Sequence, residues 1–180
     1  MNANAEVLRL SHPDGREHFL GATFCFTHDW ASVEAYHLLN GRDSEQRMRL
    51  AKWQANYEPP NEFDPGYVQI GNGRIELAGD SLRGIGIGSL LMLPLVRWIK
   101  SRPEAVPVAN IDLAGEDAMT PEERDRRNRF YEKLGFTFSY SDDKTRGIST
   151  KMLSSQLIQP AFTLSQGWRV ESIEQDGCVF

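Results

Sequence analysis

Residues 81–92, "SLRGIGIGSLLM", place glycines at alternate positions 84, 86 and 88, immediately before an apolar helical run. Glycine costs backbone entropy on folding, and it suits places where another group approaches the main chain closely. The start of a helix also leaves amide N–H groups without partners and carries the positive end of the helix dipole. This stretch therefore predicts a turn that binds a phosphate group through its backbone.

Length and composition limit the class of protein. The chain has 180 residues, 40% of them hydrophobic and 25% charged, which is ordinary for one globular domain over residues 1–180. A net charge of -5 argues against binding to nucleic acid through a broad basic surface. No signal peptide or bilayer-length apolar run is recognisable, and Cys25 and Cys178 lack metal-site spacing. We expect a cytoplasmic protein with reduced thiols, no metal and no membrane contact.

Turn residues predict two hairpins in the first half of the chain. Residues 6–28 form two strand-like runs joined through Pro13-Asp14-Gly15, a tripeptide that reverses the chain. In residues 67–78, Asn72-Gly73 supplies the positive φ angles of a two-residue type I′ turn. Between them, residues 57–66 are rich in proline and predict a loop.

Capping signals predict helices. Asp29 and Ser44 are typical helix caps, and they predict helices over 29–39 and 44–53. Residues 90–100 have helical apolar spacing, with Pro94 expected to bend the helix or mark its first turn.

A further helix carries the most complete set of boundary signals. Thr120 is the expected cap, Pro121 occupies the first helical position, Glu123 completes a capping box, and Gly135 ends the helix. Strands are expected at 106–114, 137–140 and 148–153. The mixed order of strands and helices predicts an α/β or α+β fold.

The glycine turn departs from two familiar phosphate loops. No lysine follows the glycines, which argues against a nucleoside-triphosphate loop. The dinucleotide pattern G-x-G-x-x-G/A places Ser89 where glycine or alanine is required, although Asp112 lies where a ribose ligand is expected. A dinucleotide-binding fold is therefore a minor alternative.

Two motifs fit one family better. Arg83, Gly86 and Gly88 satisfy the pattern R/Q-x-x-G-x-G/A, and "NRFYEKLGF" at 128–136 places Asn128 three residues before Tyr131 on a helix ending in Leu-Gly-Phe. In this order, with one strand between them, the motifs resemble the GNAT superfamily of acyl-CoA-dependent N-acetyltransferases. The linker between residues 113 and 128 is longer than in most relatives.

The resemblance implies a mixed, mostly antiparallel sheet flanked by helices, with two central strands that splay apart. Acetyl-CoA would lie in the gap, with its pantetheine added as a strand and its pyrophosphate on the turn. Residues 1–60 would form the acceptor side, and residues 155–180 a C-terminal extension that completes the sheet or covers a neighbour. The implied cofactor-binding residues are Leu77, Ala78, Gly79, Arg83, Gly84, Ile85, Gly86, Ile87, Gly88, Ser89, Asn128 and Tyr131.

The implied reaction is attack of a primary amine on the thioester carbonyl. Tyr131 matches the tyrosine that donates a proton to the departing thiolate. Glu76 is the candidate base, with water, Asp80 or Asp112 as alternatives. His28 and His37 are more often structural, and Trp30, Tyr36, Trp53 and Tyr57 are more often core residues.

The sequence leaves other functions open. A non-catalytic acyl-CoA sensor or interaction module on the same fold is the main alternative to an N-acetyltransferase. The acceptor is not encoded in these motifs, although the acidic surface favours a small amine or a basic peptide. A homodimer is also left open.

Overall fold

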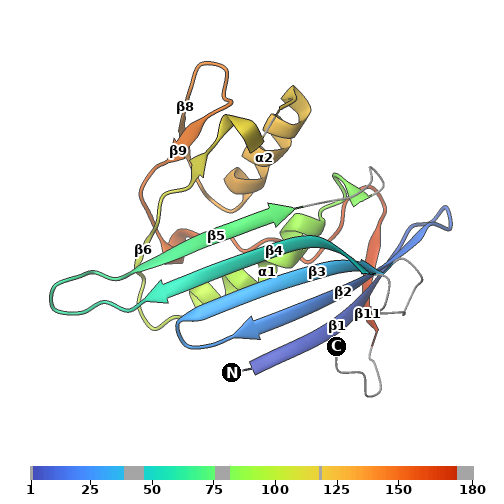
Figure 1. Ribbon diagram of the computed structural model, residues 1–180, viewed down its shortest axis with the longest axis horizontal. Helices are drawn as coiled ribbons and strands as arrows, with labels where there is room; N and C mark the ends of the chain where they lie inside the picture. Colours follow the sequence, from blue (N-terminus) through green and yellow to red (C-terminus); the bar gives the residue numbers. More distant parts are fainter. Residues whose placement is uncertain (1, 39–46, 76–81, 118, 174–180) are drawn as a thin grey trace.

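The computed structural model describes residues 2–38, 47–75, 82–117 and 119–173, which build two sheets and two α-helices (Figure 1). The larger sheet has the strand order β10-β6-β5-β4-β3-β2-β1-β11, and the smaller has the order β7-β9-β8. The strands of the large sheet are β1 (Asn2–Ser11), β2 (Glu17–Phe26), β3 (Trp30–Leu38), β4 (Arg47–Glu58), β5 (Tyr67–Ile75), β6 (Pro107–Val108), β10 (Met152–Leu153) and β11 (Arg169–Ile173).

The remaining elements lie mainly in the second half of the chain. They are α1 (Ile87–Lys100), β7 (Asp112–Leu113), the 3-10 turn η2 (Gly115–Asp117), α2 (Pro121–Lys133), β8 (Phe138–Tyr140), β9 (Gly147–Ser149) and the 3-10 turn η3 (Ser154–Gln156). All pairs in the two sheets are antiparallel except β5 with β6. The prediction of a mixed, mostly antiparallel α/β architecture is confirmed at this level. No helix in the described ranges is long and apolar enough to cross a bilayer.

The first hairpin is confirmed. β1 and β2 pair from Asn2↔Phe26 to Ser11↔Glu17, with the predicted turn between them. Gly15 takes a φ of +91°, and its amide donates to the carbonyl of His12 at 3.0 Å. Asp14 Oδ1 accepts from the amide of Arg16 at 3.1 Å, which stabilises the reversal.

The two helices predicted over 29–39 and 44–53 are wrong, because β3 and β4 occupy these parts of the chain as far as the structure describes them. In β3, Ala31, Val33 and Ala35 are buried at every second position, a period that belongs to a strand. In β4, Trp53 and Tyr57 are buried on the same face of the sheet. Alanines and charged residues gave these segments a local helical preference, and strand pairing overrides it.

The hairpin predicted at Asn72-Gly73 is also wrong. β5 continues through both residues as one strand beside β4, and the prediction's last residues, 76–78, lie outside the described residues. The register moves from Gln54↔Gly71 to Lys52↔Arg74, so β5 has one residue more than β4 in this interval. A β-bulge therefore absorbs the Asn-Gly pair that would otherwise form a turn.

The strand predicted over 106–114 is divided between the two sheets. β6 pairs in parallel with β5 at Val68↔Val108, and the amide of Ala109 donates to the carbonyl of Val68 at 2.8 Å. The chain then leaves β5, and β7 pairs with β9 in the small sheet. β5 and the chain after β6 therefore diverge from this point, as Figure 1 shows.

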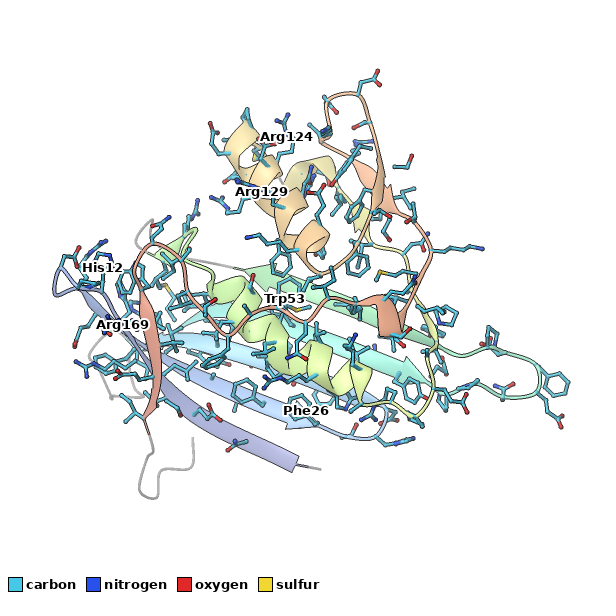
Figure 2. All side chains as sticks on the ribbon, turned by 180° about the vertical axis from the view of Figure 1, so that it is seen from behind. His12, Phe26, Trp53, Arg124, Arg129 and Arg169 are labelled. Atoms are coloured by element: carbon cyan, nitrogen blue, oxygen red, sulfur yellow. The ribbon has the colours of Figure 1, made fainter. Side chains whose placement is uncertain are left out.

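α1 covers one face of the large sheet, and a C-terminal segment crosses over it. α1 contacts β3 and β4 and buries leucine, isoleucine and methionine side chains against them, with Pro94 inside the helix. We call residues 157–168 the strap; it passes over α1 in Figure 2. At one end, Lys100 Nζ donates to the carbonyl of Leu157 at 2.9 Å. At the other, β11 continues the strap and pairs with β1, so this part of the C-terminal extension does complete the sheet.

The boundaries of α2 follow the predicted capping box. The amide of Glu123 donates to Thr120 Oγ1, and the amide of Thr120 donates to Glu123 Oε2, both at 3.2 Å. At the other end, Gly135 takes a φ of +96°, as expected of the glycine that terminates a helix.

Removing the cap tests its contribution. Thr120→Ala leaves the Glu123 amide without its acceptor and should lower the free energy of unfolding by about 1 kcal/mol. Urea denaturation measures the change, with Ser139→Ala at an exposed position of β8 as the control. Equal stability of the two variants would contradict a stabilising cap.

Candidate functional site

Two of the three glycines in the turn take left-handed backbone conformations. Gly84 and Gly86 take φ angles of +78° and +104°, values that L-residues with side chains rarely adopt. Gly86 is the N-cap of α1 and supplies no side-chain cap. Ile85 and Ile87 are only 2% and 1% exposed. Their side chains anchor the turn in the core, so only their backbone groups can contact a ligand.

The first turn of α1 carries hydrogen-bond donors and no negative charge. Within the described ranges, no atom accepts from the amides of Gly86, Ile87, Gly88 or Ser89, and the helical ladder begins when Leu90 N donates to the Gly86 carbonyl at 3.0 Å. The first turn contains no acidic residue. Such a helix terminus favours an anion, through both its free donors and its dipole.

The strap lies against the other side of the turn. Ser165 N donates to the Ile85 carbonyl at 2.8 Å, and Ser165 Oγ donates to the Gly84 carbonyl at 2.9 Å. A Cβ atom added to Gly86 would lie 3.6 Å from the Thr163 carbonyl oxygen. The turn is thus packed against the protein itself on its carbonyl side.

Arg83 connects the turn to α2. Arg83 Nη1 lies 3.9 Å from Glu123 Oε1, and both side chains are substantially exposed. An ion pair of this length in solvent stabilises the fold by at most about 1 kcal/mol. The main effect of this ion pair is therefore to hold the Arg83 side chain near the start of α2, where Glu123 also forms the capping box.

Among the described residues, the edge of β5 next to the divergence has main-chain groups without a strand partner. Alternate residues of a strand direct their N–H and C=O groups to the same side. Since the Val68 carbonyl points toward Ala109, the N–H and C=O of Ile70 point to that side as well, where the chain has turned to the small sheet. The predicted strand-addition residues, Leu77, Ala78 and Gly79, lie outside the described residues.

Tyr131 lies in an aromatic cluster between the two sheets. Its ring centroid is 5.1 Å from that of Phe130 and 6.2 Å from that of Phe138 in β8. Phe130 in turn stacks on Trp53 of β4 at 5.2 Å. The side chain is half-buried, so neighbouring rings orient it while part of it stays accessible. Its predicted role as an acid stays a prediction.

Asn128 is used inside the protein. It is 5% exposed, its Nδ2 donates to the Lys144 carbonyl at 3.2 Å, and its Oδ1 accepts from Arg127 Nε at 3.1 Å. Arg127 also donates to the Thr145 carbonyl at 2.8 Å. These bonds fasten α2 to the loop between β8 and β9. The predicted cofactor contact of Asn128 would have to be made in addition to them.

The candidate bases are distributed widely. Glu76 and Asp80 lie outside the described residues, and Asp112 is exposed on β7. His28 is exposed, and its ring contacts the edge of Tyr57 at 6.1 Å. His37 belongs to the cluster described next. Trp53 and Tyr57 are core residues as expected, whereas Trp30 and Tyr36 are half-buried.

A histidine cluster that the sequence did not predict lies beside the end of the strap. His18 Nδ1 is 3.3 Å from His37 Nε2, and the His18 ring stacks on Trp168 at 5.4 Å. The His12 ring also contacts Trp168, with ring centroids 5.2 Å apart, and His12 Nε2 is 3.0 Å from the Gln166 carbonyl oxygen. These residues are far apart in the chain, so only the pairing of β1, β2, β3 and β11 reveals the cluster.

Burial favours the neutral form of two of these rings, His18 and His37. Desolvation lowers the pKa of His18, and the charges of His37 and Arg16 lower it further; desolvation also lowers the pKa of His37. Among the described atoms, His18 Nε2 is buried without a hydrogen-bond partner. Protonation of the pair would place positive charge beside Arg16 in a site that disfavours charge.

The described residues hold no group of three or more His, Cys, Asp or Glu side chains arranged for a metal ion. No family model, curated protein or solved structure matches this chain. The geometry of the site and its two motifs therefore carry the functional argument.

The pKa shifts predict a dependence of stability on pH. The folded-state pKa values of His18 and His37 are lowered, so the folded state favours the neutral rings. Their contribution to the free energy of unfolding is therefore complete above the unfolded pKa of 6.5 and is lost as the pH falls below it. Thermal unfolding should show a lower Tm at pH 5.5 than at pH 7.5. His18→Phe, which retains the stacking on Trp168, should reduce this difference, whereas His28→Gln at an exposed position should not. An unchanged difference in His18→Phe would contradict the assignment.

Proposed function

We propose that this protein is an N-acetyltransferase of the GNAT type, which transfers the acetyl group of acetyl-CoA to a primary amine. One observation carries the proposal: no described atom accepts a hydrogen bond from the amides at the start of α1. This helix is the next α-helix after β5, the strand from which β6 diverges. A diphosphate at the start of α1 would receive backbone hydrogen bonds without needing a basic side chain. The two sequence motifs support the same assignment.

The edge of β5 that lacks a strand partner among the described residues suits the pantetheine arm. Its two amides resemble an extended peptide, and the N–H and C=O of Ile70 are directed to the side from which an added strand would pair. Pantetheine would bind along this edge while the diphosphate binds at residues 84–89. This arrangement would orient the thioester without requiring a metal ion.

In the proposed reaction, the amine nitrogen attacks the thioester carbonyl carbon and forms a tetrahedral intermediate. The C–S bond then breaks, and Tyr131 donates its phenolic proton to the CoA thiolate. The amine must lose a proton, for which Glu76 or an ordered water is the proposed acceptor. Tyr131 returns to its neutral form by taking a proton from solvent. The position of Tyr131 between the two sheets, beside the diverging strands, supports its role.

A matched pair of variants tests the diphosphate site. Asp and Asn both tolerate positive φ angles better than most residues and differ mainly in charge, so Gly86→Asp and Gly86→Asn should strain the turn similarly. Calorimetry should give Gly86→Asp a higher Kd for CoA than Gly86→Asn, because a carboxylate at the N-cap of α1 opposes a second anion at this helix end even when the side chain lies toward the strap. Equal affinities would contradict binding at this turn.

Replacement of the proposed acid tests catalysis. Tyr131→Phe keeps the aromatic packing and removes the hydroxyl, so kcat should fall by about 100-fold or more while CoA affinity is retained. Mass spectrometry of an amine and peptide panel incubated with acetyl-CoA identifies the acceptor for this assay. If CoA binds but no amine is acetylated, the protein is an acyl-CoA sensor instead. A thermal shift with NAD and none with CoA would favour the dinucleotide alternative.

A further inference from the structure

The contact between the strap and the glycine turn is made at Ser165. Its amide and hydroxyl donate to the carbonyls of Ile85 and Gly84, at 2.8 and 2.9 Å. Two consecutive peptide units of the turn are therefore held by one residue that follows Gly84 by 81 positions.

The geometry of the peptide bond gives these contacts a directional consequence. In a trans peptide, the C=O and N–H groups point to opposite sides of the chain, and no cis peptide occurs in the described residues. The Gly84 carbonyl shares its peptide unit with the Ile85 amide, and the Ile85 carbonyl shares its unit with the Gly86 amide. With both carbonyls bound to Ser165, the two amides point away from the strap.

We propose that Ser165 is a positioning residue, which holds the glycine turn in the orientation that presents the amides of Ile85 and Gly86 to the diphosphate of CoA. This inference rests on the proposed function and adds a residue that neither motif contains. Ser165 does not touch the ligand; it acts through the peptide units of the turn.

The turn needs such support because its own chain restrains it weakly. Ordering each residue costs backbone entropy, and glycine loses more freedom than any other residue. Gly86 provides no side-chain cap for α1. Ile85 and Ile87 fix the side chains of the turn, but burial of a side chain leaves the adjacent peptide planes free to rotate. Hydrogen bonds to the Gly84 and Ile85 carbonyls fix those planes.

The strap can impose this geometry because it is anchored independently of the turn. Next to Ser165, His12 Nε2 lies within 3.0 Å of the Gln166 carbonyl oxygen, and Trp168 is buried against His12 and His18. Beyond Trp168, β11 pairs with β1. The strap also covers the carbonyl side of the turn, with the Thr163 carbonyl oxygen 3.6 Å from the position of a Gly86 Cβ. The diphosphate therefore approaches from the opposite side.

Three variants test the proposal by calorimetry with CoA. Ser165→Ala removes one hydrogen bond and should raise the Kd for CoA ~2- to 10-fold, which corresponds to one net hydrogen bond. Ser165→Thr retains a hydroxyl at an exposed position and should restore wild-type affinity. Ser139→Ala, remote on β8, should bind as the wild type does. In turnover, Ser165→Ala should raise the KM for acetyl-CoA and leave kcat unchanged.

Pantetheine, which lacks the diphosphate, separates positioning from a general structural effect. The affinity of pantetheine, measured by its competition with CoA, should be the same for wild type and Ser165→Ala. Unchanged CoA affinity in Ser165→Ala, failure of Ser165→Thr to restore it, or an equal loss for pantetheine would overturn the positioning role.

The proposed function can fail separately. If the wild type binds CoA but acetylates no amine, acetyl transfer is wrong, and the CoA affinities of the Ser165 variants still decide the positioning role. If the wild type binds neither CoA nor inorganic pyrophosphate, both proposals are overturned.

Discussion

The hydrogen bonding of β5 determines the arrangement of the site. β5 pairs with β4 along most of its length, but with β6 only around Val68. After β6 the chain no longer pairs with β5 and enters the small sheet as β7. The aromatic residues of α2 then pack between the small sheet and β4. A continuous β5–β6 ladder would instead pair the main-chain groups along this edge of β5. Among the described residues, the divergence therefore leaves main-chain groups of β5 without a strand partner inside the sheet, which is where we propose that pantetheine pairs.

The glycine turn combines two opposite requirements. Its backbone must adopt positive φ angles at Gly84 and Gly86, which the glycines permit, and it must keep one shape when a ligand arrives. Ile85 and Ile87 supply part of that rigidity from within the core. Ser165 supplies the rest from outside, by bonding to the carbonyls. A turn that is flexible by composition is thereby held in one shape by its neighbours, which would reduce the entropy lost on binding of the proposed diphosphate.

Sequence reasoning succeeded where the signal was local. The capping box of Thr120 and Glu123 and the reversal at Gly15 each depend on a few adjacent residues, and both are present. It failed for β3 and β4, where alternating burial opposes helical propensity, and at Asn72-Gly73, where pairing with β4 turns a hairpin signal into a bulge. Ser165 and the histidine cluster depend on contacts between distant segments, so no local pattern reveals them. Glu76 and residues 77–79 lie outside the described residues, and their predicted roles stay predictions.

The position of Ser165 in the chain sets the order in which the protein can mature. Ribosomes synthesise Gly84 long before Ser165, and the strap is anchored through β11 on β1, the first strand to emerge. A nascent chain still held near residue 150 can form the β1–β5 meander but has no strap with which to fix the turn. Final closure thus waits for the pairing of β1 with β11, which is slow to form because it encloses a long loop. The glycine turn can therefore acquire its finished shape only after Ser165 has been synthesised and has emerged from the ribosome.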